Sequence, residues 1–452
     1  MEFSSNSWGY WFYLGLRLTS HDEKTLIEQK LKWRFLVTLR NSTSMKLILD
    51  QPFVKLFKSK EYRLFWIAAF FSNIGMWALI YGRLWLMRTL TDSEAMLGLV
   101  SSANLTPVLL LSIFGGVIAD KYNRLRILRL TRLFFCFMTL LTGILIFFKL
   151  INPIVLILIS LVTGTLLAFD IPSRSSMIAK LVKKEYLPVA ISMYSIVFGV
   201  SAIIGPSLFH PIVKIIGLEG LFFIIGISYL LTFITLKKMN LKLHDPVISR
   251  SNGILKELKL GWNYLIRTPI IFIVVFIGFF FGLTAGSYDV LLPAITTDFL
   301  SGDSEVYGEL LLYGGASGLI STIILILFGQ KLNQYIFYFG FGLISSISLI
   351  LMGSNFGISN IFIIFAVISF AKGFFNTMGT TIIQSNVKEE FRGRIMSISQ
   401  LSWGSVAIGA VLVGYLAEFF SIKLALVTIG ISSLGVIIIG GVITSIRLLR
   451  IR

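Results

Sequence analysis

Long apolar stretches alternate with short polar segments along most of the chain. From residue 63 onward, runs of 18 or more mostly apolar residues recur, which is the length that a helix needs to cross the hydrocarbon core of a bilayer. Backbone polar groups cannot stay unpaired in lipid, and the runs lack the alternation of barrel strands, so they are predicted to be helices. The twelve predicted spans are about 64–88, 96–119, 127–148, 153–171, 187–211, 218–236, 269–297, 306–328, 332–352, 358–384, 394–419 and 423–446.

The chain contains an internal repeat. Val182–Tyr186 resembles Val387–Phe391, which lies 205 positions later, and the matches continue beyond it. Parallel six-helix repeats predict an all-α membrane protein whose two six-helix bundles are related by a pseudo-twofold axis. The expected divisions are a partly disordered N-terminal cytoplasmic extension (1–60), an N-terminal bundle (61–240), a cytoplasmic linker (241–268) and a C-terminal bundle (269–452).

Residues 1–44 differ from the rest of the chain. They are aromatic at first and then charged, without the apolar core and small-residue cleavage site of a signal peptide. Met45 opens a more ordinary beginning, Met-Lys-Leu, and we expect it to be the native start. Whether residues 1–44 belong to the native protein stays open.

Charge adds an orientation to this picture. Lys and Arg concentrate in alternate loops, so the positive-inside rule predicts a multi-pass protein of the cytoplasmic membrane with both termini in the cytoplasm. The opposite loops contain few basic residues, mainly Arg88, Lys149, Lys214 and Lys423. The net charge of +18 would suggest a nucleic-acid partner for a soluble protein. Here the basic residues lie in short loops, so lipid headgroups are the expected contacts and no nucleic acid is expected.

Several classes of site are disfavoured. Cys136 is a single cysteine within an apolar stretch, and the three histidines are far apart, so neither a disulfide nor a metal site is predicted. The sequence shows neither a Ser–His–acid set nor a phosphate-binding Gly-Lys-Ser/Thr loop. We therefore expect neither an enzyme nor a primary pump, and no cofactor.

A distinctive motif follows the second predicted helix. Residues 115–126 read GGVIADKYNRLR. This run resembles the cytoplasmic loop signature of the major facilitator superfamily. In it, Gly116 is expected to permit close helix contact, and Asp120 to accept hydrogen bonds or pair with Arg. Asn123 stands where that family usually has Gly, and Asn tolerates a left-handed turn.

The resemblance implies a role for this loop. In that superfamily the loop braces the cytoplasmic gate, so we expect Asp120 to lie near the start of the eleventh helix. The alternative is that these charges only fix the topology. The expected gate residues are Gly116, Asp120, Arg124, Asp170, Arg174, Arg392 and Arg394.

Further motifs narrow the resemblance to one branch. From about Tyr62 to the C-terminus, the chain is similar to the branch that contains siderophore exporters and macrolide efflux proteins. The motifs that carry this are Phe169–Ser175, Gly205-Pro206, Arg392–Ser397 and Gln400–Gly404. The Gly-Pro pair resembles an antiporter motif, although Ser201 replaces its usual upstream Gly and Ala202 replaces an Arg of the branch. The alternative is a helix bend that does not set the direction of transport.

Lys372 is the clearest charge inside a predicted span. It lies about 20 Å along its helix, and an ionisable side chain at that depth is costly and therefore a functional candidate. Asn376 lies one turn further on, so a polar stripe follows one face and is predicted to line a substrate cavity. The alternative is a lysine whose stem packs while its ammonium reaches water. Lesser cavity candidates are Asn73, Asn104 and Gln400.

Arg83 and Asp289 lie near the outer ends of the first and seventh spans. We expect them to pair and close an outer gate, or else to extend separately to the headgroups. Asp170 is placed at the cytoplasmic edge, so no carboxylate is expected at mid-depth. Lys372 is then a titratable group that could couple transport to protons.

The predicted function is a secondary-active exporter of a small amphipathic molecule, drug-like or siderophore-like, that works by alternating access as a monomer. The alternatives are an importer of a small metabolite with the same fold and, from a different class, a non-transporting membrane receptor. The identity and charge of the substrate, the coupling ion and the direction stay open at this point.

Overall fold

The computed structural model describes residues 52–240, 254–329, 332–354, 360–399 and 401–451. In this part of the chain, eleven helices are long and apolar enough to cross a membrane, and Gly404–Phe419 is a shorter apolar helix. The all-α prediction is therefore confirmed. Pro52–Lys60 belongs to a separate unit and contains helix α4 (Pro52–Lys58), whereas Glu61–Arg452 forms one compact unit. The predicted start at Met45 lies outside the described residues.

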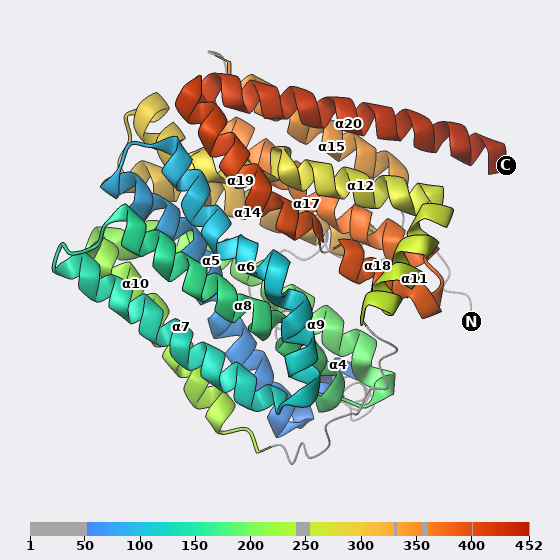
Figure 1. Cartoon of the computed structure of the whole chain (residues 1–452), viewed down its shortest axis with the longest axis horizontal. Helices are drawn as coiled ribbons and strands as arrows, with labels where there is room; N and C mark the ends of the chain where they lie inside the picture. Colours follow the sequence, from blue (N-terminus) through green and yellow to red (C-terminus); the bar gives the residue numbers. More distant parts are fainter. Residues whose placement is uncertain (1–51, 241–253, 330–331, 355–359, 400, 452) are drawn as a thin grey trace, which may run out of the picture. The chain divides into compact units, whose positions relative to one another are not determined.

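Two sets of six crossings follow each other along the chain (Figure 1). The N-terminal half consists of α5 (Lys60–Leu90), α6 (Glu94–Lys121), α7 (Arg124–Phe147), α8 (Pro153–Leu181), α9 (Leu187–Ser207) and α10 (Phe209–Lys237). The C-terminal half consists of α12 (Pro269–Leu283) with its continuation to Phe299, α14 (Ser304–Phe328), α15 (Gln334–Met352), α17 (Ile361–Asn386), α18 (Glu389–Ser399) with α19 (Leu401–Phe419), and α20 (Ile422–Ile451).

The two halves pack against each other mainly through two helix pairs. Helix α6 lies along α19, and α9 lies along α14. Glycines permit the first contact, because a Cβ on Gly98 would lie 2.3 Å from the carbonyl oxygen of Ala410. Figure 1 shows α6 and α19 side by side between the two sets of helices.

The seventh crossing is not the continuous helix that was expected. After α12 it continues as a 3₁₀ segment (Ala285–Leu291), a short α turn (Leu292–Ala294) and a π segment (Ile295–Phe299). The interruption begins at Thr284, whose ψ of −95° is not helical. Irregular turns inside a long helix leave carbonyl groups without their usual partners and often mark functional positions.

The fourth crossing is longer than predicted. Helix α8 continues through Pro172 to Leu181, so its polar end is not a loop. Pro172 cannot donate to the carbonyl of Ala168, which is therefore free on one side. A Cβ on Gly115 would lie 2.1 Å from that carbonyl oxygen. Gly115, and not Gly116 as expected, is the residue that permits close contact, since a Cβ on Gly116 would meet nothing within 4 Å.

The structure adds detail at two further places. Asn123 has a φ of −63° and is not left-handed; its side chain caps α7 by accepting from the backbone N–H of Arg126. The second part of the predicted linker at 241–268 is occupied by amphipathic helix α11 (Ile254–Arg267), which packs on α18. Its basic residues had been counted only as loop charge. The proposed domain boundaries in this linker include residues 241–253, which lie outside the described residues.

Candidate functional site

A lysine–aspartate pair lies at the interrupted seventh crossing. Lys372 Nζ is 2.9 Å from Asp289 Oδ2 and 3.4 Å from the carbonyl oxygen of Gly286, which belongs to the 3₁₀ segment. The ammonium also lies 5.3 Å from the centre of the Tyr288 ring. The side chains of Lys372 and Asp289 are 26% and 28% exposed, so the pair is open on one side and not sealed in the core. Asn376, one turn further along α17, is exposed as well.

This pair corrects the expected depth of Asp289. Lys372 is eleven residues into the 26-residue helix α17, so its partner also lies well inside the membrane span. The depth had been estimated by counting residues along one helix, which ignores tilt and any projection beyond the hydrocarbon. Asp170 is not at the end of its helix either, because α8 extends eleven residues beyond it, or about 16 Å.

Arg83 does not pair with Asp289. Its Nη1 donates to Asn104 Oδ1 and its Nη2 to Thr163 Oγ1, both at 3.0 Å. Asn104 and Thr163 are each ten residues into their helices, about 15 Å from the ends where those helices begin. Helical side chains point toward the N-terminus of their helix, so Arg83 on α5 reaches back into the interior and not outward to the headgroups.

A second buried cluster lies between α7, α8 and α5. Arg132 is 2.6 Å and Arg174 is 3.4 Å from Asp170 Oδ2, and Thr131 donates to Asp170 Oδ1. Asp170 is fully buried. Arg174 also donates to Asn73 Oδ1 at 2.9 Å, so Asn73 lies in the interior of the N-terminal half and not on an open cavity wall. This cluster ties helices of one half together.

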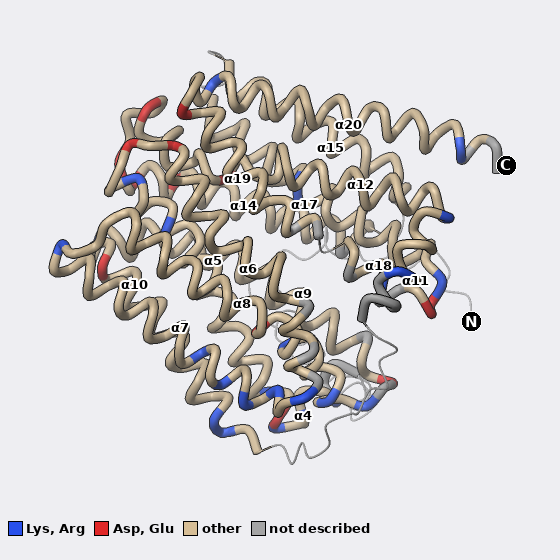
Figure 2. The backbone as a smooth tube through the Cα atoms, viewed as in Figure 1, with Lys and Arg blue, Asp and Glu red and all other residues tan. Residues whose placement is uncertain are grey.

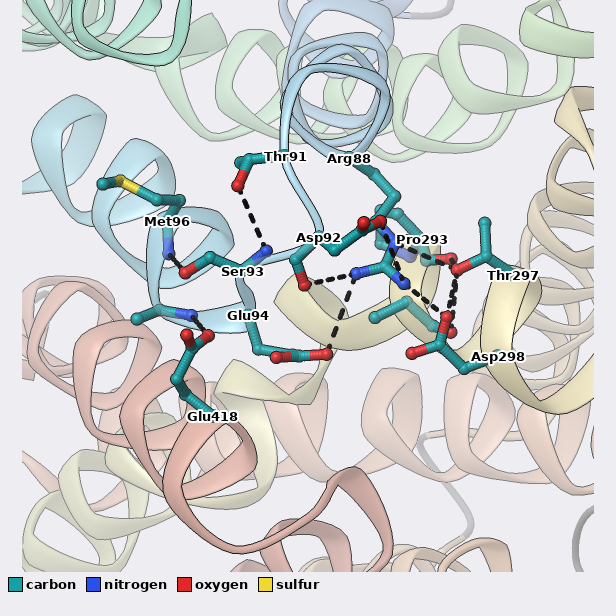
Figure 3. Close-up of polar contacts among 12 residues, drawn as sticks. Arg88, Thr91, Asp92, Ser93, Glu94, Met96, Pro293, Thr297, Asp298 and Glu418 are labelled. Atoms are coloured by element: carbon teal, nitrogen blue, oxygen red, sulfur yellow. Dashed lines mark hydrogen bonds and ion pairs between the residues drawn. The ribbon is translucent and has the colours of Figure 1, made fainter.

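Arg88 is the centre of a polar network at the other end of α5 (Figure 3). Its side chain is 7% exposed and forms an ion pair and a hydrogen bond with Asp298. It also donates to Thr297 Oγ1 at 3.0 Å and to the backbone oxygen of Asp92 at 2.6 Å, and it lies 3.7 Å from Glu94. Because Asp298 and Thr297 belong to the seventh crossing, this network joins the two halves.

Aromatic side chains fill the space beneath this network. Tyr307 of α14 stacks on Trp85 at 4.8 Å and meets Phe209 edge-on at 5.0 Å. Its hydroxyl donates to the backbone oxygen of Tyr81. The rings of Tyr307, Trp85 and Phe209 are all buried. Together they close the space between the halves at this end.

Further polar contacts join the halves at the same end. Lys214 Nζ lies 2.9 Å from Glu305 Oε1, and His210 is 3.6 Å from the same oxygen. The backbone N–H of Ala95 donates to Glu418 of α19. Figure 2 shows acidic residues gathered at this end, while Lys and Arg are prominent at the opposite end.

Basic residues in the outer loops are the sequence signal for these contacts. Arg88, Lys214 and Lys423 were noted only as exceptions to the positive-inside pattern. In the structure, Arg88 and Lys214 form ion pairs between the halves, and Lys423 lies 5.9 Å from the ring centre of Phe299. Each of these three basic residues departs from the positive-inside pattern and contacts a specific partner in the structure.

The residues expected at the cytoplasmic gate are only partly described. Arg124 donates to the carbonyl oxygens of Ala119 and Ser176, which ties the ends of α6 and α8 within one half. Arg394 lies 5.2 Å over the ring of Phe391 and packs near Gly261 of α11. The side chains of Asp120 and Arg392 lie outside the described residues, so their expected proximity stays a prediction. The cavity candidate Gln400 is also outside that part.

The Gly205-Pro206 pair lies in the last turn of α9. A Cβ on Gly205 would lie 2.8 Å from the backbone oxygen of Ile74 and from Trp77 Cβ, so the glycine permits α9 to approach α5 closely. The sharp change of direction comes later, at Gly217, whose φ of 74° suits a residue without a Cβ.

Comparison with known proteins gives consistent matches over this whole region. A family model described as transmembrane secretion effector matches residues 52–450. The staphyloferrin A transporter of Staphylococcus aureus (strain NCTC 8325 / PS 47) is 27% identical over 378 residues, which are 82% of this chain and 93% of that protein. Macrolide efflux protein A of Streptococcus pyogenes is 22% identical over 319 residues, 69% of this chain and 78% of that protein.

Solved structures share the fold. A point mutant of the nucleoside transporter NupG superposes with a TM-score of 0.66 at 12% identity, over 84% of this chain and 98% of that chain. A bacterial homologue of the human lysosomal transporter Spinster, in an inward-facing and occupied conformation, superposes with a TM-score of 0.64 at 14% identity, over 86% and 96%. At these identities the likeness concerns the arrangement of helices alone.

Proposed function

The chain belongs to the family of transmembrane secretion effectors, within the major facilitator superfamily, and from this membership we propose that it exports a small amphipathic molecule across the cytoplasmic membrane by alternating access. The basic loops support an orientation with both termini in the cytoplasm. The end closed by Arg88 is then the outer end.

The Lys372–Asp289 pair is the observation that carries this proposal. Charged groups inside a membrane span are costly and are kept where they face a pathway. Both side chains are more than a quarter exposed, although they lie well inside their spans, so the pair is accessible from one side. The irregular backbone at Ala285–Leu291 adds carbonyl oxygens next to it. Interrupted helices form binding sites in many transporters of this architecture.

The contacts at the closed outer end are the second element of the proposed mechanism. In alternating access, the site opens to one side while the other is shut, so the contacts of Arg88 and Tyr307 must break in each cycle. These contacts connect α5 and α10 with the seventh and eighth crossings. We propose that they form the outer gate, in place of the expected Arg83–Asp289 pair.

The site also fits a coupled proton. Asp289 and Lys372 form an ion pair that either a proton or a ligand charge can disrupt. We propose that a coupling proton and the substrate compete at this pair. We also propose that the protein works as a monomer, without a catalytic step. Exchange of a proton for substrate at one site gives obligatory coupling.

Transport into membrane vesicles tests the function. Inverted and right-side-out vesicles with the wild-type protein or Lys372→Ala are given radiolabelled staphyloferrin A or a radiolabelled macrolide, the compounds named in the relatives. We expect accumulation in energised inverted vesicles that the Lys372→Ala variant loses. Uptake that occurs only in right-side-out vesicles would favour the importer. Wild-type vesicles that accumulate neither compound above the level of protein-free membranes would contradict the proposed substrate class.

A further inference from the structure

Arg83 is a buried cation whose hydrogen-bonding capacity is mostly unused. A guanidinium has five N–H donors, and Arg83 places two of them on the neutral oxygens of Asn104 and Thr163. Its Nε has no partner in the structure, and the residue is 4% exposed. Within the described residues it forms no ion pair.

This isolation sets Arg83 apart from the other ionised groups in the interior of the spans. Arg132 and Arg174 share Asp170, and Lys372 has Asp289. Within the described interior of the N-terminal half, three arginines (Arg83, Arg132 and Arg174) are therefore accompanied by one aspartate, Asp170, which pairs with the last two. A buried charge without a counter-charge is strongly destabilising, so its retention points to a counter-ion that comes and goes.

A small pocket lies beside the guanidinium. It has a volume of about 50 Å³ and is bordered by Arg83, Ser101 and Asn104 together with apolar side chains of α5 and α6. The described structure gives no hydrogen bond to the Asn104 amide nitrogen or to the Ser101 hydroxyl. All three polar groups can donate to a ligand, which suits an anion. The volume fits a carboxylate group but not a whole drug-sized molecule.

The pocket faces the boundary between the halves. Gly98 and Leu109 of α6 contact α19 at Ala410 and Gly404. Ser101 and Leu105 lie between those two positions at helical spacing, so they share the face that α6 turns toward the C-terminal half. A substrate between the halves can therefore place one end in this pocket.

We infer that Arg83, Ser101 and Asn104 bind a carboxylate group of the transported molecule. The inference rests on the proposed function for the source of the carboxylate. Arg binds carboxylates in a bidentate manner, and the bound anion supplies the missing counter-charge. The substrate is then an amphipathic acid, held by its carboxylate in the N-terminal half while the remainder extends toward Lys372.

Ligand-induced thermal stabilisation of the full-length protein in detergent tests this without any transport. The probes are aliphatic and aromatic carboxylic acids with one, two or three carboxylates, citrate and benzoate included, each paired with its methyl ester. The acids are expected to raise the melting temperature of the wild type more than the esters do, since a ligand of the native state stabilises it. Sodium chloride at matched ionic strength is expected to give no such effect.

The variants locate the site. Arg83→Gln is expected to weaken the apparent binding of the best acid about tenfold or more, as for a lost charged hydrogen bond. Arg83→Lys should retain part of the binding, and Ser101→Ala should weaken it less. Arg447→Gln, a matched change at an exposed arginine of α20 outside the proposed site and gates, should leave it unchanged. If Arg83→Gln does not fold, Arg83→Lys and Ser101→Ala still test the site.

The opposite results are equally defined. Equal stabilisation by acids and esters, equal stabilisation by chloride, or unchanged affinity in every pocket variant that folds would overturn the inference. Acid binding that depends on Arg83 in a protein that transports nothing would refute the transport proposal alone. Vesicle transport that persists without any preference for acids would refute the carboxylate site alone.

Discussion

Replacing Arg88 by Gln should open the outer end of the protein. The Arg88 side chain is almost fully buried in the closed structure and joins α5 to Thr297 and Asp298 of the seventh crossing. Gln is neutral and shorter, so it cannot maintain the ion pair or the full set of hydrogen bonds. These contacts cross between the halves, so they stabilise the closed outer end relative to the open one.

The free energy lost in Arg88→Gln depends on how exposed the partner carboxylate of Asp298 is. A hydrogen bond to a charged group contributes roughly 1.5–3 kcal/mol. Asp298 is 35% exposed, so water can solvate its carboxylate after the arginine is lost, and the lower part of that range applies. A loss of about 2 kcal/mol corresponds to a shift of roughly 30-fold toward the open outer end.

Cysteine accessibility measures this shift. Leu311 is 3% exposed and lies on α14 between Gly308 and Gly315, which both pack against the N-terminal half. A cysteine at this position is covered while the outer end is closed and reachable when the halves part. The native Cys136 is buried and gives a low background. The labelling rate with a membrane-impermeant maleimide, added outside intact cells, is expected to rise roughly 30-fold with Arg88→Gln.

Two comparisons make this result specific. Arg447→Gln removes an exposed arginine from α20 and should leave the rate unchanged. The exchange Arg88→Asp with Asp298→Arg should restore slow labelling that either single change has lost. An unchanged rate in Arg88→Gln would refute the outer-gate reasoning.

Three further changes have defined outcomes. Lys372→Ala should lower vesicle transport at least about tenfold, while the melting temperature moves by only a few degrees, because the ion pair is partly exposed; a large loss of stability would instead indicate a structural role. Gly115→Ala should greatly reduce the yield of folded protein in size-exclusion chromatography, because its Cβ would lie 2.1 Å from the Ala168 carbonyl oxygen. Gly116→Ala should be tolerated, and equal yields of the two variants would contradict the packing argument. Asp170→Asn should cost about 3–5 kcal/mol by leaving two buried arginines without their carboxylate, seen as a lower midpoint in denaturant, and an unchanged midpoint would refute the pairing.

The fold could be predicted because its causes are local. Lipid requires long apolar helices, and their number, order and duplication follow directly from the pattern of residues. The break between the fifth and sixth crossings was placed too late, since α9 ends at Ser207 and α10 begins at Phe209, although the expected start at residue 218 coincides with the kink at Gly217 inside α10. The end of α8 was missed because Pro172 and its polar neighbours resemble a helix end, although a proline inside a long helix is tolerated where neighbours satisfy the freed carbonyl.

The pairing of charges was less predictable. Lys372 was expected near mid-membrane without a named partner, whereas Asp289 was assigned to the outer end and to Arg83 because its depth was counted along a single helix. Arg83 and Arg88 lie five residues apart on α5, and the sequence alone does not say which of them reaches the seventh crossing. Side-chain direction, helix tilt and the 3₁₀ and π turns of the seventh crossing decide that, and these depend on tertiary packing.

Distance measurement between the halves tests alternating access most directly. Spin labels are placed at Leu150→Cys and Phe420→Cys, two exposed positions in outer loops of different halves, in a Cys136→Ser background. Double electron–electron resonance in lipid nanodiscs is expected to give two populations, the distance of the closed structure and a longer one that grows in Arg88→Gln. A single distance that does not change with that substitution or with transported ligand would contradict a protein whose halves separate at the outer end.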